Sequence, residues 1–198
     1  MSRSNKLSMR RIRRFLKNKE GTAAIEFAIL AIPFFALLFG ILELAIVFFM
    51  SSNLNHAVSE VGRQIRTGNF QACGSPEKFK ELVCEEMAGN GICSKVLRID
   101  VVSGNDFSSI TLADVPPPPG EDPDNPGETL DVENGEWDAN AENASVPVVI
   151  RGLYYHPLAL PSEFTRLSNV DSQNIRVLAA TTAFKNEPFP APGECPGA

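Results

Sequence analysis

The stretch Gly21-Thr22-Ala23-Ala24-Ile25-Glu26-Phe27 divides the chain into two parts of different character. Residues 1–20 before it contain eight Lys or Arg and one acidic residue. Residues 27–49 form an apolar run in which Glu43 is the one charged residue. About 20 apolar residues suffice for a helix to span the hydrocarbon core of a membrane. The sequence therefore predicts a transmembrane helix over residues 22–50, preceded by a basic leader over residues 1–21.

Charge is distributed unevenly on the two sides of this helix. The formal net charge is −6, yet residues 51–198 alone hold ten basic and 21 acidic residues. Basic flanks of membrane helices stay on the cytoplasmic side. We therefore expect a cytoplasmic N-terminus and an exported, acidic C-terminal domain. We do not expect the leader to bind nucleic acid, because the apolar run holds its charges at a membrane.

Two export signals are alternatives to a lasting membrane helix. A cleavable signal peptide has an apolar region of about 7–15 residues, followed by a small-residue cleavage site. The run here is longer, and residues 51–57, SSNLNHA, make a poor cleavage site. Arg13-Arg14-Phe15 approaches a twin-arginine signal but lacks the residue that separates the arginine pair from the Phe. The sequence disfavours both alternatives.

The cysteines all lie in the half expected to be exported: Cys73, Cys84, Cys93 and Cys195. An even number in an oxidising compartment indicates disulfides, and four cysteines allow three connectivities. Cys84 and Cys93 flank a turn-like segment and are the first candidate pair, which would leave Cys73 with Cys195. A zinc site is the alternative, but the spacings are not of the C-x2-C type and His56 and His156 lie far away in the sequence.

Beyond residue 50 the helical pattern continues as an amphipathic stem over residues 51–68. Its apolar residues recur at helical spacing: Leu54, Ala57, Val58, Val61 and Ile65. Gly68-Asn69 is the expected stop. The apolar stripe would pack on a globular domain or on a neighbouring subunit; the alternative is a plain anchor with a short stem.

Residues 69–198 are expected to form the exported domain. Ser75-Pro76 predicts the start of a helix that ends near residues 89–91. Residues 96–102, 146–155 and 175–184 predict three strands, and residues 158–167 a short helix. The predicted fold class is α+β: a long N-terminal helix continuing into a stem, then one or two helices and an antiparallel sheet of about three strands.

Residues 115–145 differ from the rest of this domain. They begin with VPPPPG and are rich in Pro, Gly, Asn, Asp and Glu. Such a composition predicts a flexible insertion that contributes little to the core. Its acidic residues do not follow the D-x-[DN]-x-[DN]-G pattern of a calcium loop. We expect no metal or other cofactor.

Catalytic motifs are not found in the sequence. There is no G-x-S-x-G, H-E-x-x-H, G-x-x-x-x-G-K-[ST] or G-x-G-x-x-G pattern. His56 and His156 flank no evident nucleophile. We therefore expect no catalytic residue and no enzymatic activity. A periplasmic hydrolase on a signal anchor would need a nucleophile or metal cluster that the sequence does not offer.

A small residue at the membrane boundary, followed five positions later by a carboxylate, resembles the processing site of type IV prepilins. The wider frame, from Gly21–Phe27 through Pro33, Gly40, Glu43 and Leu44, resembles the TadE-like family of tight-adherence (Tad) pilus assembly proteins. Residues 148–158 and 179–189 also look like members of this family. The resemblance implies a pilin-like architecture and cleavage between Gly21 and Thr22 by a prepilin peptidase of the bacterial inner membrane.

The resemblance also implies how the protein would act. Glu26 and Phe27 would lie at a subunit contact, with Glu26 pairing with the N-terminal amine of a neighbouring subunit. A lone charge in hydrocarbon is costly, and a cationic partner offsets the cost. The implied partners are the peptidase, the inner-membrane platform, other TadE-like subunits and the major pilin. The protein would be a pseudopilin or minor pilin with a periplasmic domain, in the membrane or in the pilus.

The sequence leaves two alternatives open. Glu43 lies near the outer end of the span and could reach the lipid headgroups or contact another subunit. The chain could also be an uncleaved, signal-anchored envelope protein whose exported domain binds a ligand or stiffens an assembly. Glu26 would then be an incidental acid near the headgroups.

Overall fold

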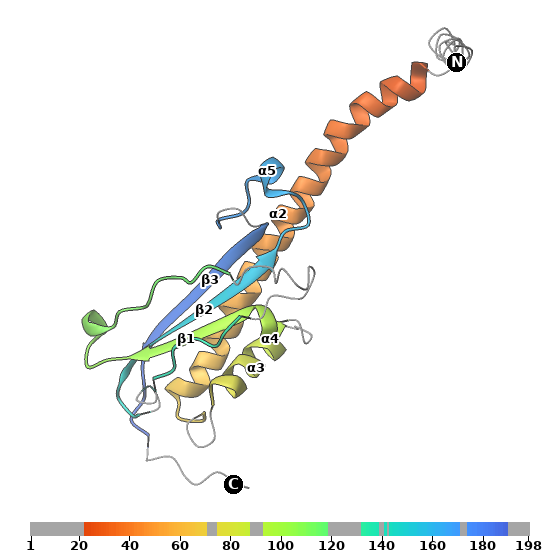
Figure 1. Ribbon diagram of the computed structural model, residues 1–198. Coiled ribbons are helices and arrows are strands. Elements are labelled where there is room, and N and C mark those ends of the chain that lie inside the picture. Colours follow the sequence, from red (N-terminus) through yellow and green to blue (C-terminus); the bar gives the residue numbers. More distant parts are fainter. Residues whose placement is uncertain are drawn as a thin grey trace, which may run out of the picture. The chain divides into compact units, whose positions relative to one another are not determined.

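The computed structural model describes residues 22–70, 75–87, 93–118, 132–138, 141, 143–170 and 174–189 (Figure 1). The architecture is α+β, as predicted: a long apolar helix precedes a small domain of short helices and a three-stranded antiparallel sheet. The helices are α2 (Thr22–Arg66), α3 (Pro76–Glu86), α4 (Cys93–Val96), the 3-10 turn η2 (Phe107–Ser109) and α5 (Ser162–Thr165). The strands are β1 (Leu97–Ser103), β2 (Pro147–Pro157) and β3 (Ile175–Lys185), in that spatial order.

Helix α2 runs without interruption through the predicted membrane span and stem, and Pro33 lies inside it. Among the described residues it is the one helix long and apolar enough to cross a membrane. The chain divides between Leu42 and Glu43 into two compact units, so α2 contributes to both. The predicted stop is confirmed within two residues, because Gly68 adopts a φ of 81° and the amide of Asn69 bonds back to the carbonyl of Gln64.

The second half of α2 packs on one face of the sheet. Its predicted apolar stripe is buried at every position: Leu54, Ala57, Val58, Val61 and Ile65. Gly62 lies on the same side, and a Cβ placed there would come within 3.2–3.3 Å of Ile150, Thr182 and Phe184. The stripe thus packs on the protein's own domain, which was one of the two predicted targets, and the plain-anchor alternative is wrong.

Helix α3 begins as the sequence predicts. The Ser75 side chain accepts a hydrogen bond from the Lys78 amide, and Pro76 is the first helical residue. Phe79 and Val83 are fully buried in the main core. The predicted disulfide between Cys84 and Cys93 is confirmed and joins α3 to α4. Cys73 and Cys195 lie outside the described residues, and their pairing stays a prediction.

The sheet divides the interior into two clusters because side chains alternate across it. Ile150 of β2 lies with the α2 stripe in the main core. Leu153 and Tyr155 of β2 lie on the other face with Val132 and Ile175 in a second cluster. The antiparallel pairing of β2 with both neighbours fixes this division, with Asp100 opposite Arg151 and Leu153 opposite Ala179.

The expectation that residues 115–145 add little to the core was wrong for the described part of the second half of this range. Val132 and Ala141 are buried, and Trp137 packs against Phe70 and Phe79 at ring-centroid distances of 6.0 and 5.9 Å. The backbone around Trp137 also forms a parallel bridge to Val101. This segment therefore covers the outer edge of β1, which would otherwise expose unpaired backbone groups.

We predict that Gly62→Val destabilises the domain by about 1–3 kcal/mol, because the added methyl groups have no room between α2 and the sheet. Thermal unfolding of the full chain in detergent, followed by circular dichroism, measures the effect. Ser59→Val is the matched control, since Ser59 is exposed on the same helix and its replacement should change stability by no more than about 0.5 kcal/mol. Equal melting temperatures for the two variants would contradict close packing at Gly62.

Candidate assembly helix and its buried carboxylate

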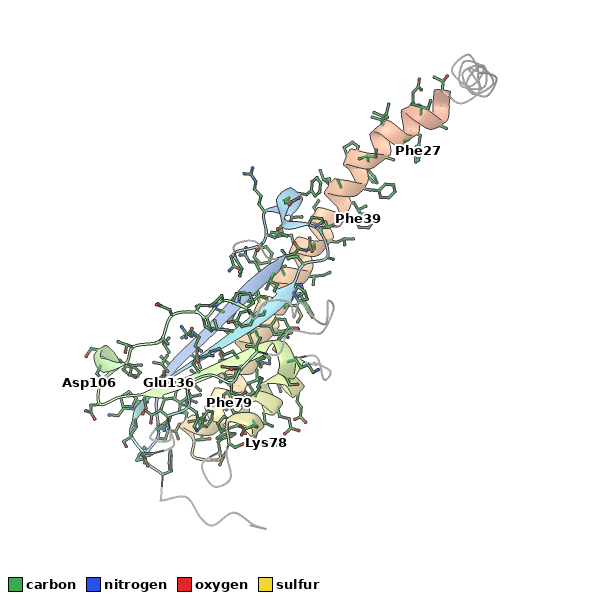
Figure 2. All side chains as sticks on the ribbon, in the orientation of Figure 1. Phe27, Phe39, Lys78, Phe79, Asp106 and Glu136 are labelled. Carbon is green, nitrogen blue, oxygen red and sulfur yellow. A yellow bond between two sulfur atoms is a disulfide. The ribbon has the colours of Figure 1, made fainter. Side chains whose placement is uncertain are left out.

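The first half of α2 presents large apolar side chains to its surroundings. Ile25 is 63% exposed and Phe27 is 70% exposed. Phe34, Phe35 and Phe39 follow, with ring-centroid distances of 5.4 and 6.0 Å between successive rings. Figure 2 shows Phe27 and Phe39 projecting outward from the helix. A helix that is apolar all round is normally covered by lipid or by other helices.

Thr22 and Glu26 lie one helical turn apart at the start of α2, and both are exposed. Residues four apart in a helix share a face. Gly21 lies outside the described residues, so cleavage between Gly21 and Thr22 stays a prediction, as do the subunit contacts of Glu26 and Phe27.

Glu43 is buried, although it lies on an apolar helix. It is 4% exposed, and its Oε1 accepts hydrogen bonds from the backbone amides of Ala159 and Leu160, the latter at 3.0 Å. Its Oε2 is buried with no hydrogen-bond partner. Neither sequence interpretation of Glu43 anticipated this contact. The carboxylate binds α2 to the connection between β2 and β3 of the same chain.

His156, at the end of β2, lies close to this carboxylate. Burial lowers the pKa of His156, and the charge of Glu43 acts in the opposite direction. The burial effect is the larger, so the imidazole is mostly neutral at pH 7. The two backbone amides are therefore the groups that hold Glu43 in place, rather than a full ion pair with His156.

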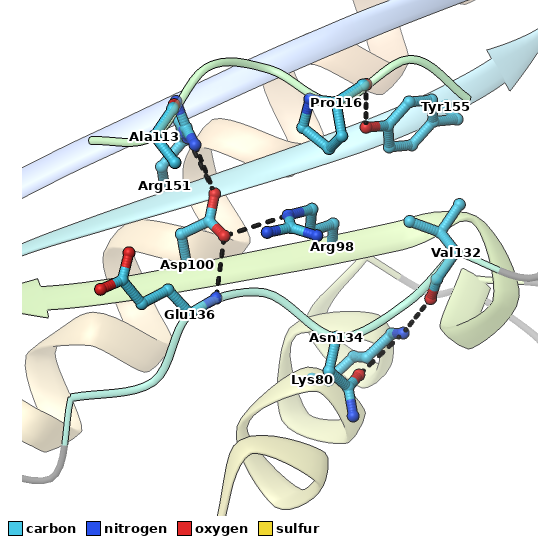
Figure 3. A network of polar contacts seen from close by, with 10 residues as sticks. All are labelled: Lys80, Arg98, Asp100, Ala113, Pro116, Val132, Asn134, Glu136, Arg151 and Tyr155. Atoms are coloured by element: carbon cyan, nitrogen blue, oxygen red, sulfur yellow. Dashed lines mark hydrogen bonds and ion pairs between the residues drawn. The ribbon is translucent and has the colours of Figure 1, made fainter. Parts of the chain in front are cut away.

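A second buried carboxylate lies on the opposite face of the sheet from α2 (Figure 3). Asp100 binds Arg151 at 2.6 and 2.9 Å and Arg98 at 3.0 Å, and it accepts a bond from the Glu136 amide at 3.1 Å. Arg151 in turn donates to the Ala113 carbonyl at 2.8 Å. This network joins the segments on either side of residues 119–131 to the sheet.

Three further hydrogen bonds, from two side chains, hold the same segments. The Tyr155 hydroxyl donates to the Pro116 carbonyl at 2.9 Å, and burial raises the pKa of this phenol. Lys80 of α3 donates to the Asn134 side chain at 3.3 Å and to the Val132 carbonyl at 3.5 Å. Figure 3 shows both segments lying along the strands. Side-chain donors thus add to the packing of Val132 and Trp137 in holding these Pro-rich and acidic segments.

Residues 21–63 match the family described as TadE-like protein. Over this segment the chain is similar to TadE-like proteins. The match covers the exposed first half of α2, Glu43 and most of the stem, and it ends before the sheet. No curated protein and no solved structure matched the chain. TadE-like proteins are a structural family with no catalytic role indicated, and among the described residues no group of three His, Cys, Asp or Glu could hold a metal ion.

The TadE-like segment thus contains Glu26 and Glu43, the two acidic residues that the sequence analysis proposed as contact sites on the apolar helix. The structure brings Glu43 against Ala159 and Leu160, and it leaves Glu26 exposed. Sequence reasoning missed Asp100 and Arg151. One signal could have identified them, because a charged residue inside an otherwise apolar strand pattern often has a buried charged partner. Trp137 was a second signal, as the one Trp of the chain within a polar range.

We predict that Glu43→Ala frees the β2–β3 connection from α2, because two backbone amides lose their acceptor. Each unsatisfied group costs about 1–3 kcal/mol when buried. Hydrogen exchange at the Ala159 and Leu160 amides should become faster. Glu43→Gln should retain protection, since its side-chain oxygen still accepts both bonds. Glu60→Ala, at a half-buried glutamate of the same helix that pairs with Arg63, is the control; unchanged exchange in Glu43→Ala would show that the carboxylate does not hold the connection.

We predict that Asp100→Ala destabilises the domain by about 3–5 kcal/mol, because Arg151 is left buried without its partner. The segments bound by this network should become accessible to a protease that cleaves after glutamate, at Glu133 and Glu136. Digestion followed by mass spectrometry measures the cleavage rate. Asp114→Ala removes an exposed carboxylate from the same region and should leave the rate unchanged. Equal rates for the two variants would contradict the fastening role of Asp100.

Proposed function

We propose that this chain is a TadE-like pseudopilin or minor pilin of the Tad pilus assembly machinery. It is anchored in the bacterial inner membrane by α2, with its N-terminus in the cytoplasm and its sheet domain in the periplasm. A prepilin peptidase cleaves it between Gly21 and Thr22. It acts by packing its helix against other subunits, and it catalyses no reaction.

One observation carries this proposal: the TadE-like match falls on a helix whose two halves have different surroundings. The second half buries its apolar stripe against its own sheet. The first half leaves Ile25, Phe27, Ile29 and Leu30 exposed. This apolar surface is therefore available to lipid before assembly and to neighbouring helices after it.

Glu26 gives this surface a specific contact. It lies five positions after Gly21, so cleavage would create a new α-amine at Thr22, one turn away on the helix. The same chain then carries one cation and one carboxylate in an apolar setting. Pairing them between adjacent subunits offsets the cost of placing each charge in hydrocarbon. Partners that satisfy this contact are other TadE-like subunits or the major pilin.

Cleavage is tested by the intact mass and N-terminal sequence of the membrane-extracted chain, in hosts with and without prepilin peptidase. We predict a chain that starts at Thr22 only when the peptidase is present. Gly21→Val should block processing, because a branched side chain prevents the backbone from entering the active site. Gly40→Val is the matched control within α2, where the added Cβ meets open space.

The competing function is an uncleaved, signal-anchored envelope protein. A chain that retains Arg13 and Arg14 in both hosts would establish that alternative and overturn processing. The control variant distinguishes a specific block at Gly21 from failed membrane insertion, because Gly40→Val must still be inserted and cut.

A further inference from the structure

Phe164 has the greatest exposure of the large apolar side chains described. It lies on α5, in the connection between β2 and β3, and is 84% exposed. Single exposed apolar residues are common on protein surfaces and need no partner of their own. The position of α5 relative to helix α2 indicates what the exposed Phe164 side chain contacts.

Glu43 fixes that position. Its carboxylate binds the amides of Ala159 and Leu160, which lie only a few residues before Phe164 in the chain. With a rise of about 1.5 Å per residue, Glu43 lies roughly 9 Å before Phe49 along the helix axis. The β2–β3 connection is therefore level with the last part of the apolar run, and not with the polar stem that follows it.

Helix α2 is still apolar on its outer sides at this level. Leu44, Ile46, Phe48 and Phe49 are exposed, whereas Glu43 and Val47 are buried. The polar sequence Ser51-Ser52-Asn53 marks the outer end of this apolar surface. With α2 anchored in the membrane as proposed above, this level lies at the boundary between acyl chains and headgroups.

We propose that residues 158–170 of the β2–β3 connection lie in the headgroup region of the same membrane, with Phe164 inserted among the lipids. The inference rests on the proposed membrane anchoring by α2. An inserted aromatic ring removes apolar surface from water, and short interfacial segments bury their apolar side about 5–10 Å into this region. Arg166, exposed two residues later, is suited to lipid phosphates. A lipid occupant is favoured over a protein because the exposed apolar surface of α2 continues to the same level.

The opposite end of the sheet provides a control. Phe107 is also an exposed Phe, 50% exposed, in the turn η2 after β1. Figure 1 shows α5 where β2 leads into β3, and Figure 2 shows Asp106, the residue before Phe107, at the other end of the sheet. Strand β2 has 11 residues between these ends, about 33 Å at the usual rise per residue. Phe107 should therefore remain in water.

Tryptophan quenching tests the proposal on the full chain in vesicles of phosphatidylethanolamine and phosphatidylglycerol. Three variants are compared with the unmodified chain, whose Trp137 supplies the background: Phe39→Trp, Phe164→Trp and Phe107→Trp. Each is measured in vesicles with and without bromine on the acyl chains. We expect loss of emission for Phe39→Trp and Phe164→Trp, and none for Phe107→Trp. Glu163→Trp, at an exposed position of the same connection, gives a second measurement should Phe164→Trp alter the circular dichroism spectrum.

The variants separate this inference from the proposed function. Quenching of Phe39→Trp without quenching at positions 164 and 163 would overturn the membrane contact while leaving α2 as an anchor; the exposed Phe164 would then be a surface for a protein partner. No quenching of Phe39→Trp would overturn membrane anchoring and this inference together. Equal quenching of Phe107→Trp and Phe164→Trp would also overturn it, because the contact would not be specific to one end of the sheet.

Discussion

The packing of the second half of α2 onto the three-stranded sheet is the contact on which the rest of the domain depends. Three strands with one covered face are near the minimum for a stable sheet. The helix supplies that cover through an unbroken stripe from Leu54 to Ile65, and Gly62 lets the two backbones approach closely. The disulfide between Cys84 and Cys93 then holds α3 and α4 together beside this core.

Polar bonds complete the other face of the sheet. Residues 132–138 are mostly polar, and residues 113–116 are held by backbone carbonyls that accept side-chain hydrogen bonds. Asp100 accepts a hydrogen bond from the Glu136 amide, and its partner Arg151 donates to the Ala113 carbonyl. Arg98 also binds Asp100, and Tyr155 adds a bond to Pro116. A buried ion pair of this kind adds little stability over an apolar pair, but it penalises any arrangement that leaves a charge unpaired. It therefore specifies where these segments lie.

Local patterns were sufficient to predict α2, α3, α5 and the three strands, although not α4 or η2, and long-range pairs were not predictable from them. The helical spacing of Leu54 to Ile65, the Ser75-Pro76 cap and the alternation in three strands each depend on neighbours in the sequence, and the structure confirms them. The bond from Glu43 to Ala159 joins residues 116 positions apart, and that from Asp100 to Arg151 spans 51. Such pairs depend on the strand register and on the level at which the β2–β3 connection meets α2. Neither can be read from the pattern of a single sequence. The polar composition of residues 115–145 led to the wrong expectation that this range adds little to the core. Its few large apolar residues, among them Val132 and Trp137, pack there despite their polar neighbours.

Glu43 belongs to the local helical pattern of α2 and also makes a long-range contact with the β2–β3 connection. One side of α2 must change from exposed to buried at a defined residue, since the same side of a helix cannot both face its surroundings and pack on a sheet. Glu43 is where the covering changes: before it the large apolar side chains are exposed, and after it the side with Val47 and Leu54 is buried. A leucine there would continue the apolar surface but leave the amides of Ala159 and Leu160 without an acceptor. The carboxylate thus sets the level on α2 at which the domain begins, and with it the length of helix whose large apolar side chains stay exposed.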